Sequence, residues 1–209
     1  GIIRNFENNL GMPADAQNFD DIYTKSGFIF LSQKAEFKRK LTIDLAASLN
    51  YMNYRWQSIY PIVESGHKKL ENSFLPNFGI SYLLGKGFIL RAKIGKGNSA
   101  PTTEELRSSA QEINPALNPE FGWNKEIGIR QQWRNLLFTE LSLFDFRLKN
   151  AIVRKENEIA QEYFVNAGET VQRGVEFVVE SRKIVFDTRI LKNLKFYFAG
   201  NFYDFSFKN

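Results

Sequence analysis

Strict alternation of apolar and polar side chains is the feature that most limits how this chain folds. In residues 41–51 the odd positions carry Leu, Ile, Leu, Ala, Leu and Tyr, and the even positions carry Thr, Asp, Ala, Ser and Asn. A period of two is typical of a β-strand with one apolar face. The same alternation recurs in residues 78–84, 88–94, 171–180 and 194–202, and more weakly in 28–37 and 123–133. Helical periodicity is nearly absent, so the sequence predicts an all-β fold.

The connections between these stretches alternate in length. Tight turns are expected near residues 38–40, 85–87 and 134–135, and a turn region near 181–193. Long polar connections are expected near residues 55–76 and 96–122, and a medium one near 154–162. This order predicts an antiparallel meander of about eight to ten strands, with the short turns at one end and the long loops at the other. In residues 136–152 the apolar parity changes near Leu143 and Phe144, which a bulge or an aromatic inner face would explain.

Two architectures produce such alternation. A soluble sandwich buries its apolar face against a second sheet, whereas a membrane barrel turns that face to lipid and keeps a polar lumen. Strands of about 9–11 residues suit a membrane barrel, because soluble strands average about 5–6. Aromatic residues near the ends of the alternating stretches would form the interfacial girdles of a barrel. These are Tyr51, Tyr54, Trp56, Trp123, Trp133, Tyr203 and Phe205. Strand length and girdles favour the barrel, with the sandwich as the alternative.

Composition excludes several kinds of site. The chain has no cysteine, so disulfides and thiolate metal sites are impossible. A single histidine, His67, argues against a histidine zinc site, so no metal, cofactor or catalytic residue is predicted, and we expect no enzyme. Lys and Arg are dispersed, so we expect no nucleic-acid partner despite a net charge of +5. No apolar run reaches the roughly 18 residues of a transmembrane helix, and no signal-peptide pattern opens the chain.

One proline-rich segment resembles a known family. It contains Ala100-Pro101-Thr102, Glu105-Leu106, Asn114-Pro115-Ala116-Leu117-Asn118-Pro119-Glu120 and Glu126-Ile127-Gly128. This order of motifs, followed by Arg173-Gly174-Val175-Glu176, is similar to the upper barrel of TonB-dependent outer-membrane receptors. The resemblance covers nearly everything after about Tyr23. It implies that residues 23–209 are part of a transmembrane barrel of roughly 22 strands, without the plug domain and the terminal strands. Residues 1–22 are expected to be a loop or irregular segment.

The resemblance also implies a function. Such receptors sit in the bacterial outer membrane and import a scarce nutrient, most often a ferric siderophore, with energy from the TonB complex. The TonB contact would lie in regions absent from this chain, and the other partners would be outer-membrane lipid and the small-molecule iron chelate. A soluble β-sandwich that binds a surface or a carbohydrate is the alternative.

The candidate site residues form two groups. Four residues in the long loops are expected to face substrate, because aromatic rings and a guanidinium can hold a bulky anionic chelate. They are Trp56, Tyr60, His67 and Arg107. The second group, taken from the family motifs, is expected to be structural or to face the lumen. It contains Pro101, Glu105, Asn114, Pro115, Pro119, Glu120, Glu126, Gly128, Gly174 and Glu176.

Overall fold

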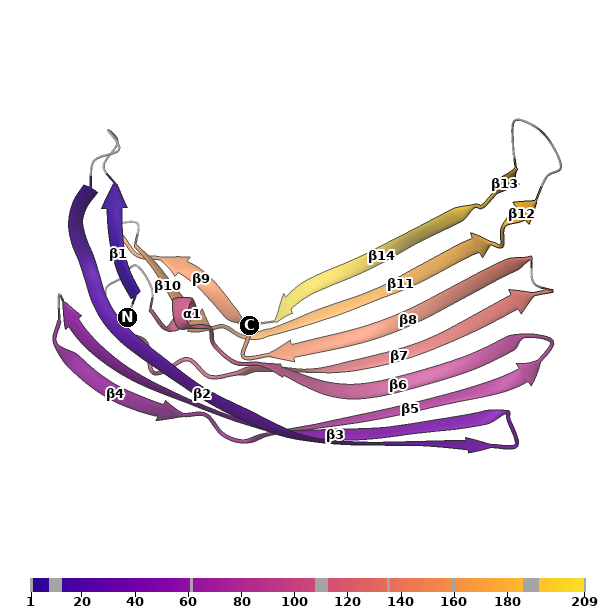
Figure 1. Cartoon of the computed structure of the whole chain (residues 1–209), viewed down its shortest axis with the longest axis horizontal. Helices are drawn as coiled ribbons and strands as arrows, with labels where there is room; N and C mark the ends of the chain where they lie inside the picture. Colours follow the sequence, from indigo (N-terminus) through magenta and orange to yellow (C-terminus); the bar gives the residue numbers. More distant parts are fainter. Residues whose placement is uncertain are drawn as a thin grey trace.

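The computed structural model describes residues 2–7, 13–60, 62–107, 113–134, 136–158, 161–185 and 192–208. Within these ranges, ten strands form one curved antiparallel sheet, in the order β1-β2-β3-β5-β6-β7-β8-β11-β14 with β4 paired to β3 (Figure 1). The strands of this sheet are β1 (Ile2–Glu7), β2 (Pro13–Phe37), β3 (Leu41–Tyr60), β4 (Glu64–Lys69), β5 (Ser73–Gly85), β6 (Phe88–Ser99), β7 (Glu120–Trp133), β8 (Leu137–Lys149), β11 (Glu169–Ser181) and β14 (Tyr197–Lys208).

Smaller elements fill the connections. Strands β9 (Ile152–Glu156) and β10 (Glu162–Asn166) form a hairpin between β8 and β11, and β12 (Ile184–Val185) pairs with β13 (Asn193–Leu194). Helix α1 (Thr103–Leu106) lies between β6 and β7. No helix formed by the described residues would cross a membrane. The tight turns lie at one end of the sheet, and β4, α1, β9 and β10 gather at the other (Figure 1), as the connection lengths predict.

The tight turns have the backbone that a two-residue hairpin needs. Lys38 and Arg39 both have positive φ, 47° and 55°, which matches the right-handed twist of the strands that they join. The next turn uses Lys86 at 50° and Gly87 at 81°, and an added Cβ on Gly87 would lie 2.4 Å from the Gln132 carbonyl oxygen. A glycine is therefore required at position 87 by both conformation and space.

The register of the strands aligns polar residues in rows on one face of the sheet and apolar residues in rows on the other. One row of paired residues crosses eight strands and is polar or glycine throughout: Glu36, Thr42, Ser81, Arg91, Gly128, Ser142, Glu176 and Asn201. The neighbouring row points to the opposite face and is apolar throughout: Ala35, Ile43, Ile80, Ala92, Ile127, Leu143, Val175 and Phe202. We call these two sides the polar face and the apolar face.

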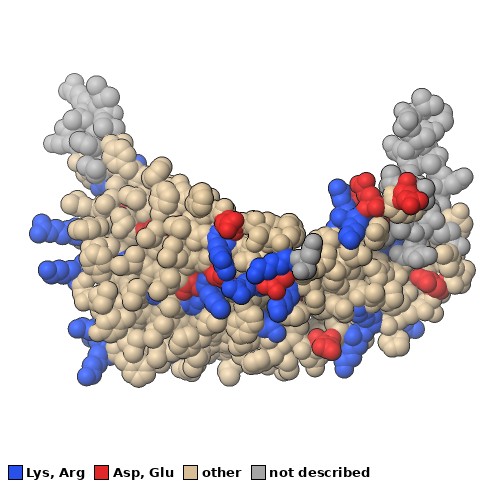
Figure 2. Space-filling model, turned by 180° about the vertical axis from the view of Figure 1, so that it is seen from behind, with Lys and Arg blue, Asp and Glu red and all other residues tan. Residues whose placement is uncertain are grey.

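The apolar face has no protein packed against it among the described residues. Ile127 is 50% exposed, Leu143 47% and Phe202 75%. A soluble sandwich would bury these side chains under a second sheet, so the sandwich alternative is wrong. Figure 2, the view from behind, shows Lys and Arg at the tight-turn end, a second group of charges nearer the middle, and uncharged side chains between them.

Two tryptophans on the apolar face are spaced like the two aromatic girdles of a strand that crosses a bilayer. Trp123 and Trp133 lie on it, at opposite ends of β7 and both about half exposed. Their ten-residue separation corresponds to about 33 Å along the strand, or about 25 Å across a bilayer at a tilt near 40°. Beyond Leu143 the same face carries Asp145, whose carboxylate pairs with Arg147 at 2.9 Å and Arg173 at 2.7 Å. Asp145 is the register partner of Lys125, so these charges lie between Trp123 and the uncharged part of the face, which runs from Ile127 to Trp133 on β7.

The structure corrects three expectations about loops and girdles. Within the segment expected to be irregular, residues 2–7 form β1 and residues 13–22 form the first part of β2, and the rest lies outside the described residues. The connection expected at 55–76 contains the end of β3, all of β4 and the start of β5. These extensions are held by strand pairing and by packing with the long connections, so they do not need the alternation that a lipid-facing strand shows. Of the expected girdle residues, Tyr54 and Trp56 are buried instead, and Tyr203 and Phe205 lie on the polar face.

The parity change in β8 is an aromatic inner face and not a bulge. Strand β8 pairs with β7 and β11 without any shift of register. Phe144 and Phe146 occupy the polar face beside Asn124 and Gln172, while Leu141 and Leu143 lie opposite Ile129 and Ile127 on the apolar face. Alternation therefore continues, with large rings at some inward positions.

Candidate functional site: polar sheet face and loop core

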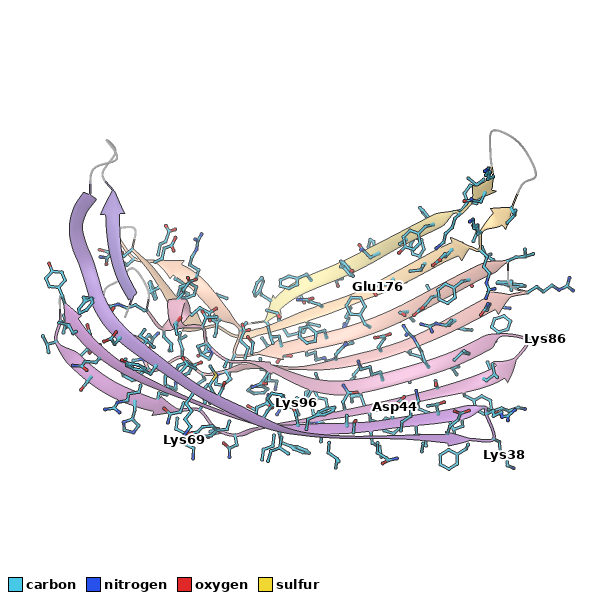
Figure 3. The ribbon with its side chains drawn as sticks, viewed as in Figure 1. Lys38, Asp44, Lys69, Lys86, Lys96 and Glu176 are labelled. Atoms are coloured by element: carbon cyan, nitrogen blue, oxygen red, sulfur yellow. The ribbon has the colours of Figure 1, made fainter. Side chains whose placement is uncertain are left out.

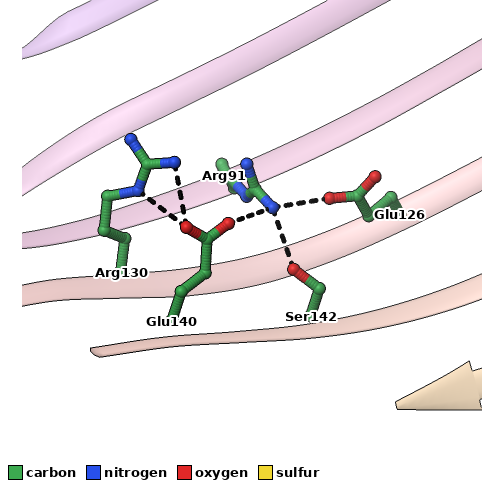
Figure 4. Close-up of polar contacts among 5 residues, drawn as sticks. All are labelled: Arg91, Glu126, Arg130, Glu140 and Ser142. Atoms are coloured by element: carbon green, nitrogen blue, oxygen red, sulfur yellow. Dashed lines mark hydrogen bonds and ion pairs between the residues drawn. The ribbon is translucent and has the colours of Figure 1, made fainter. Parts of the chain in front are cut away.

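Two arginines and two glutamates form a charge network at the centre of the polar face (Figure 4). Arg91 on β6 donates to the Glu126 carboxylate at 2.8 Å and to the Ser142 hydroxyl at 2.9 Å, and it also pairs with Glu140. Arg130 donates through Nε and a terminal nitrogen to one Glu140 oxygen, at 3.1 and 2.9 Å. The network joins three neighbouring strands and fixes their register. Its two positive and two negative charges sum to zero.

Gly128 makes room for this network. A Cβ at this position would lie 2.9 Å from the Arg91 Nε and 3.1 Å from the Ser142 hydroxyl oxygen. The Arg91 side chain therefore crosses β7 over the space that Gly128 leaves. Gly128, expected to be structural or to face the lumen, is closely packed, and its neighbours are a guanidinium and a hydroxyl.

A groove beside the network is lined by acids, amides and rings. Its volume is about 520 Å³, and its walls come from β7, β8, β11 and β14. Glu176 accepts a hydrogen bond from the Tyr203 hydroxyl at 3.1 Å. Gly174 admits the rings, because an added Cβ would lie 2.6 Å from Tyr203 and 2.7 Å from Phe144. Gly174 therefore lies in close contact with two aromatic rings.

At the end of the sheet opposite the tight turns, the long connections pack into a hydrophobic cluster that we call the loop core. Its buried members are Tyr54, Leu70, Leu106 and Leu117, from four separate parts of the chain. The Tyr54 hydroxyl donates to the Pro101 carbonyl, and both residues are fully buried. Burial raises the pKa of the Tyr54 phenol to about 12, and the charge of Glu105 adds to the shift. The loops are therefore a folded unit.

The motif residues hold the loop core together. Thr102 and Glu105 form a capping box at the start of α1: Glu105 accepts from the Thr102 N–H at 2.7 Å, and the Glu105 N–H donates to the Thr102 hydroxyl at 3.2 Å. The Asn114 amide donates to the Phe164 carbonyl at 2.9 Å. Glu120 accepts from the Ile152 N–H at 2.6 Å. Each contact ties the proline-rich connection to α1 or to the β9–β10 hairpin.

Lys68, on β4, also binds the proline-rich connection. Its ammonium group donates to the carbonyls of Pro115, at 2.6 Å, and Leu117. Pro115 and Pro119 have no backbone N–H to donate to a neighbouring strand, which disfavours a strand here. The backbone carbonyls of this segment instead accept hydrogen bonds from a side chain. Burial lowers the pKa of Lys68.

The four loop residues expected to face substrate divide into two buried and two exposed. Trp56 is 9% exposed, and its ring lies over Gly66, where a Cβ would approach the ring within 2.3 Å. Arg107 is 6% exposed and its Nε lies 2.6 Å from an Asp20 carboxylate oxygen. Tyr60 ends β3 half exposed, and His67 is exposed on β4. The structure does not bring the four together.

Sequence reasoning missed the partners of the motif residues. Arg91, Arg130 and Glu140 complete the polar network, and Asn166 bonds both Asn118 and Asn150. The Arg130–Glu140 pair could have been predicted, because the expected tight turn at 134–135 places these two residues opposite each other. The described residues contain no group of three or more His, Asp or Glu that could hold a metal ion.

Comparisons with known proteins agree with this geometry. Residues 3–209 match the protein family described as "TonB dependent receptor-like, beta-barrel". No curated protein matches the chain.

Three solved structures illustrate the shared fold. The ferric yersiniabactin uptake receptor FyuA of Yersinia pestis is 15% identical with a TM-score of 0.66, over 93% of this chain and 29% of its own. The copper transporter OprC is 12% identical with a TM-score of 0.65, over 85% and 30%. The alcaligin outer-membrane receptor FauA of Bordetella pertussis is 14% identical with a TM-score of 0.59, over 90% and 31%. The chain spans about a third of each structure.

The uniform apolar face, the polar network and the match over almost the whole chain lead to one conclusion. This chain belongs to the family of TonB-dependent outer-membrane receptors and forms part of their β-barrel.

Proposed function

We propose that this chain forms part of the wall and the outer loops of a receptor that imports a ferric siderophore, with energy supplied through TonB. The observation that carries the proposal is the placement of a folded loop core at one end of a sheet whose polar face carries balanced charges. A lipid-facing wall with a wet interior and a structured outer rim suits capture and passage of a polar solute.

The choice of an iron chelate is supported by the structural relatives. FyuA takes up ferric yersiniabactin, and FauA is a receptor for alcaligin. OprC is a copper transporter, so copper uptake is measured as the alternative. At 12–15% identity these relatives share the fold, so the nutrient of this chain is open to experiment.

The exposed loop residues are the proposed ligand contacts. Tyr60 and His67 lie on neighbouring strands above the membrane band, and both reach solvent. Trp56 and Arg107 are assigned instead to support of the loop core, because their side chains are almost fully buried. A phenol and an imidazole can both contact a chelate through rings and hydrogen bonds.

Uptake by the intact receptor tests the proposal. A strain that lacks the receptor gene should fail to accumulate radioactive iron from ferric siderophores at limiting iron, and the gene should restore uptake. Loss of TonB should abolish the same uptake. Unchanged iron uptake together with loss of copper uptake would contradict the siderophore assignment, and uptake independent of TonB would contradict the energy source.

A further inference from the structure

The sheet splits where β4 and β5 meet, and the split opens a groove. Strand β6 pairs with β5 only up to Gly95, opposite Asn77, while β5 continues to Ser73 and β4 pairs with β3 beyond it. The space between β4–β5 and the end of β6 has a volume of about 790 Å³. Both walls come from consecutive strands inside the sheet, so the groove is complete within this chain. We call it the lysine groove.

Two ammonium groups reach the lysine groove from opposite walls. The Lys69 Nζ lies 5.8 Å from the centre of the Tyr51 ring, and the Lys96 Nζ lies 5.0 Å from the centre of the Phe121 ring. Neither has a carboxylate partner among the described residues, although Glu71 also lines the groove. Lys68 is held by backbone carbonyls, so Lys69 and Lys96 supply the available charge.

The groove is continuous with the apolar face. Its floor includes Phe74 and Trp123, both partly exposed, and two residues further along the strands lie Pro76 and Lys125. Phe78 and Ile94 share one row of paired residues with Lys125, and Ile80, Ala92 and Ile127 form the next row, in the uncharged part of the apolar face. A molecule in the groove would therefore have its charged end between two lysines and its apolar end on the membrane-facing wall.

We infer that the lysine groove binds a phosphate-bearing lipid of the outer leaflet, with its headgroup phosphate between Lys69 and Lys96. A phosphate monoester carries up to two negative charges and accepts from ammonium groups. Trp123 is the girdle residue of β7 at the end with long loops, which is the outer side of such barrels. Acyl chains would extend along Phe74 and Trp123 into the bilayer. The inference rests on the membrane placement of the sheet and not on the imported nutrient.

A paired substitution with a charge-matched control tests this binding. Lys69→Gln with Lys96→Gln removes two charges at the groove, and Lys38→Gln with Lys86→Gln removes two at the tight-turn end of the same sheet (Figure 3). The delipidated receptor in neutral detergent is titrated with dioleoyl phosphatidic acid, and bound lipid is counted by native mass spectrometry. The groove variant should bind about tenfold more weakly, and the turn variant should bind within twofold of the unaltered receptor.

Further arms separate the sources of the charge. Diacylglycerol should not bind, and millimolar inorganic phosphate should not displace the lipid. Displacement by phosphate would point to a free-anion site, and equal binding of phosphatidylcholine would point to a general lipid surface. Equal loss in both variants would point to non-specific attraction, and each of these results overturns the inference. Heat-modifiable gel mobility of both variants confirms that the barrel is folded.

Discussion

The barrel wall and the loop core use the same apolar residues in opposite ways. In the wall, Leu143 and Ile127 are about half exposed and point away from the protein. In the loop core, Leu106 and Leu117 are almost fully buried by neighbouring connections. The wall therefore depends on backbone pairing and on lipid for its stability, whereas the loop core depends on side-chain packing within the protein. Substitutions that separate these two dependencies test the comparison.

The largest expected effect is a cavity in the loop core. Leu117→Ala should destabilise the loop core by about 2–5 kcal/mol, because Leu117 is fully buried and its neighbours collapse only partly. Amides of the loop core, such as Leu70 and Asn114, should exchange at least about 30-fold faster by mass spectrometry. Leu143→Ala is the control in the wall, where acyl chains refill the space. Equal acceleration in β7 and β8 would show that wall and loop core unfold as one unit.

The next effect is a charge in the lipid-facing band. Ile129→Arg should cost about 2–4 kcal/mol, because Ile129 lies on the apolar face midway between Lys125 and Trp133. Asn124→Arg, on the polar face of the same strand, should change stability by no more than about 0.5 kcal/mol. Urea unfolding of the receptor in phospholipid vesicles measures both. A larger cost for Asn124→Arg would reverse the assignment of the faces.

A smaller effect is expected where glycines admit rings. Gly174→Ala should cost about 1–3 kcal/mol, because its Cβ would meet the Phe202 carbonyl oxygen at 2.6 Å as well as two rings. Gly97→Ala is the matched control, since its Cβ would meet no atom within 4 Å. The two variants are compared by thermal unfolding in the same detergent. Equal costs in the two variants would show that crowding against the rings does not explain the glycine at position 174.

The smallest effect concerns the hydroxyl of Tyr54. Tyr54→Phe removes the bond to the Pro101 carbonyl and should cost about 0.5–1.5 kcal/mol. The phenol pKa is near 10 in the unfolded chain and about 12 in the loop core. The folded state therefore holds its proton more tightly, and this stabilisation is complete below pH 10 and is lost as the pH rises through about 12.

Phenolate absorbance distinguishes the pH response of Tyr54 from that of other tyrosines. One phenol of the unaltered receptor should titrate near pH 12, and it should be missing from Tyr54→Phe. The variant should also lose less stability between pH 10 and 12. If the phenol missing from Tyr54→Phe is instead one that titrates near pH 10, the Tyr54 hydroxyl lies in water.

The wall was predictable from sequence because lipid imposes a simple rule on it. Alternation over residues 41–51 predicted the apolar face of β3, and short turns at 38–40 and 85–87 predicted the antiparallel order. The charge network of the polar face was only partly predictable. Glu126 and the adjoining Gly128 were identified by family motif, while Arg91 and Glu140 were not. Their pairing depends on the register of three strands, which a motif does not contain.

The loop core was less predictable because no periodic rule applies to it. Strand β4 has the sequence ESGHKK, whose polar residues resemble a loop, yet β3 pairs with it over six residues. Arg107 has the composition of a ligand contact but pairs with Asp20, about ninety residues earlier in the chain. Such long-range partners follow from packing of separate connections, and neither charge nor aromatic content reveals them.

Accessibility along β7 tests the central claim most directly. The chain has no cysteine, so single cysteines from position 123 to 133 can carry a nitroxide label without background. In vesicles, labels at 127, 129 and 133 should collide readily with oxygen dissolved in lipid, and labels at 124, 126, 128 and 130 should not. A period of two with this phase is the predicted result. High oxygen accessibility at the even positions, or no period of two, would contradict a wall whose apolar face meets lipid.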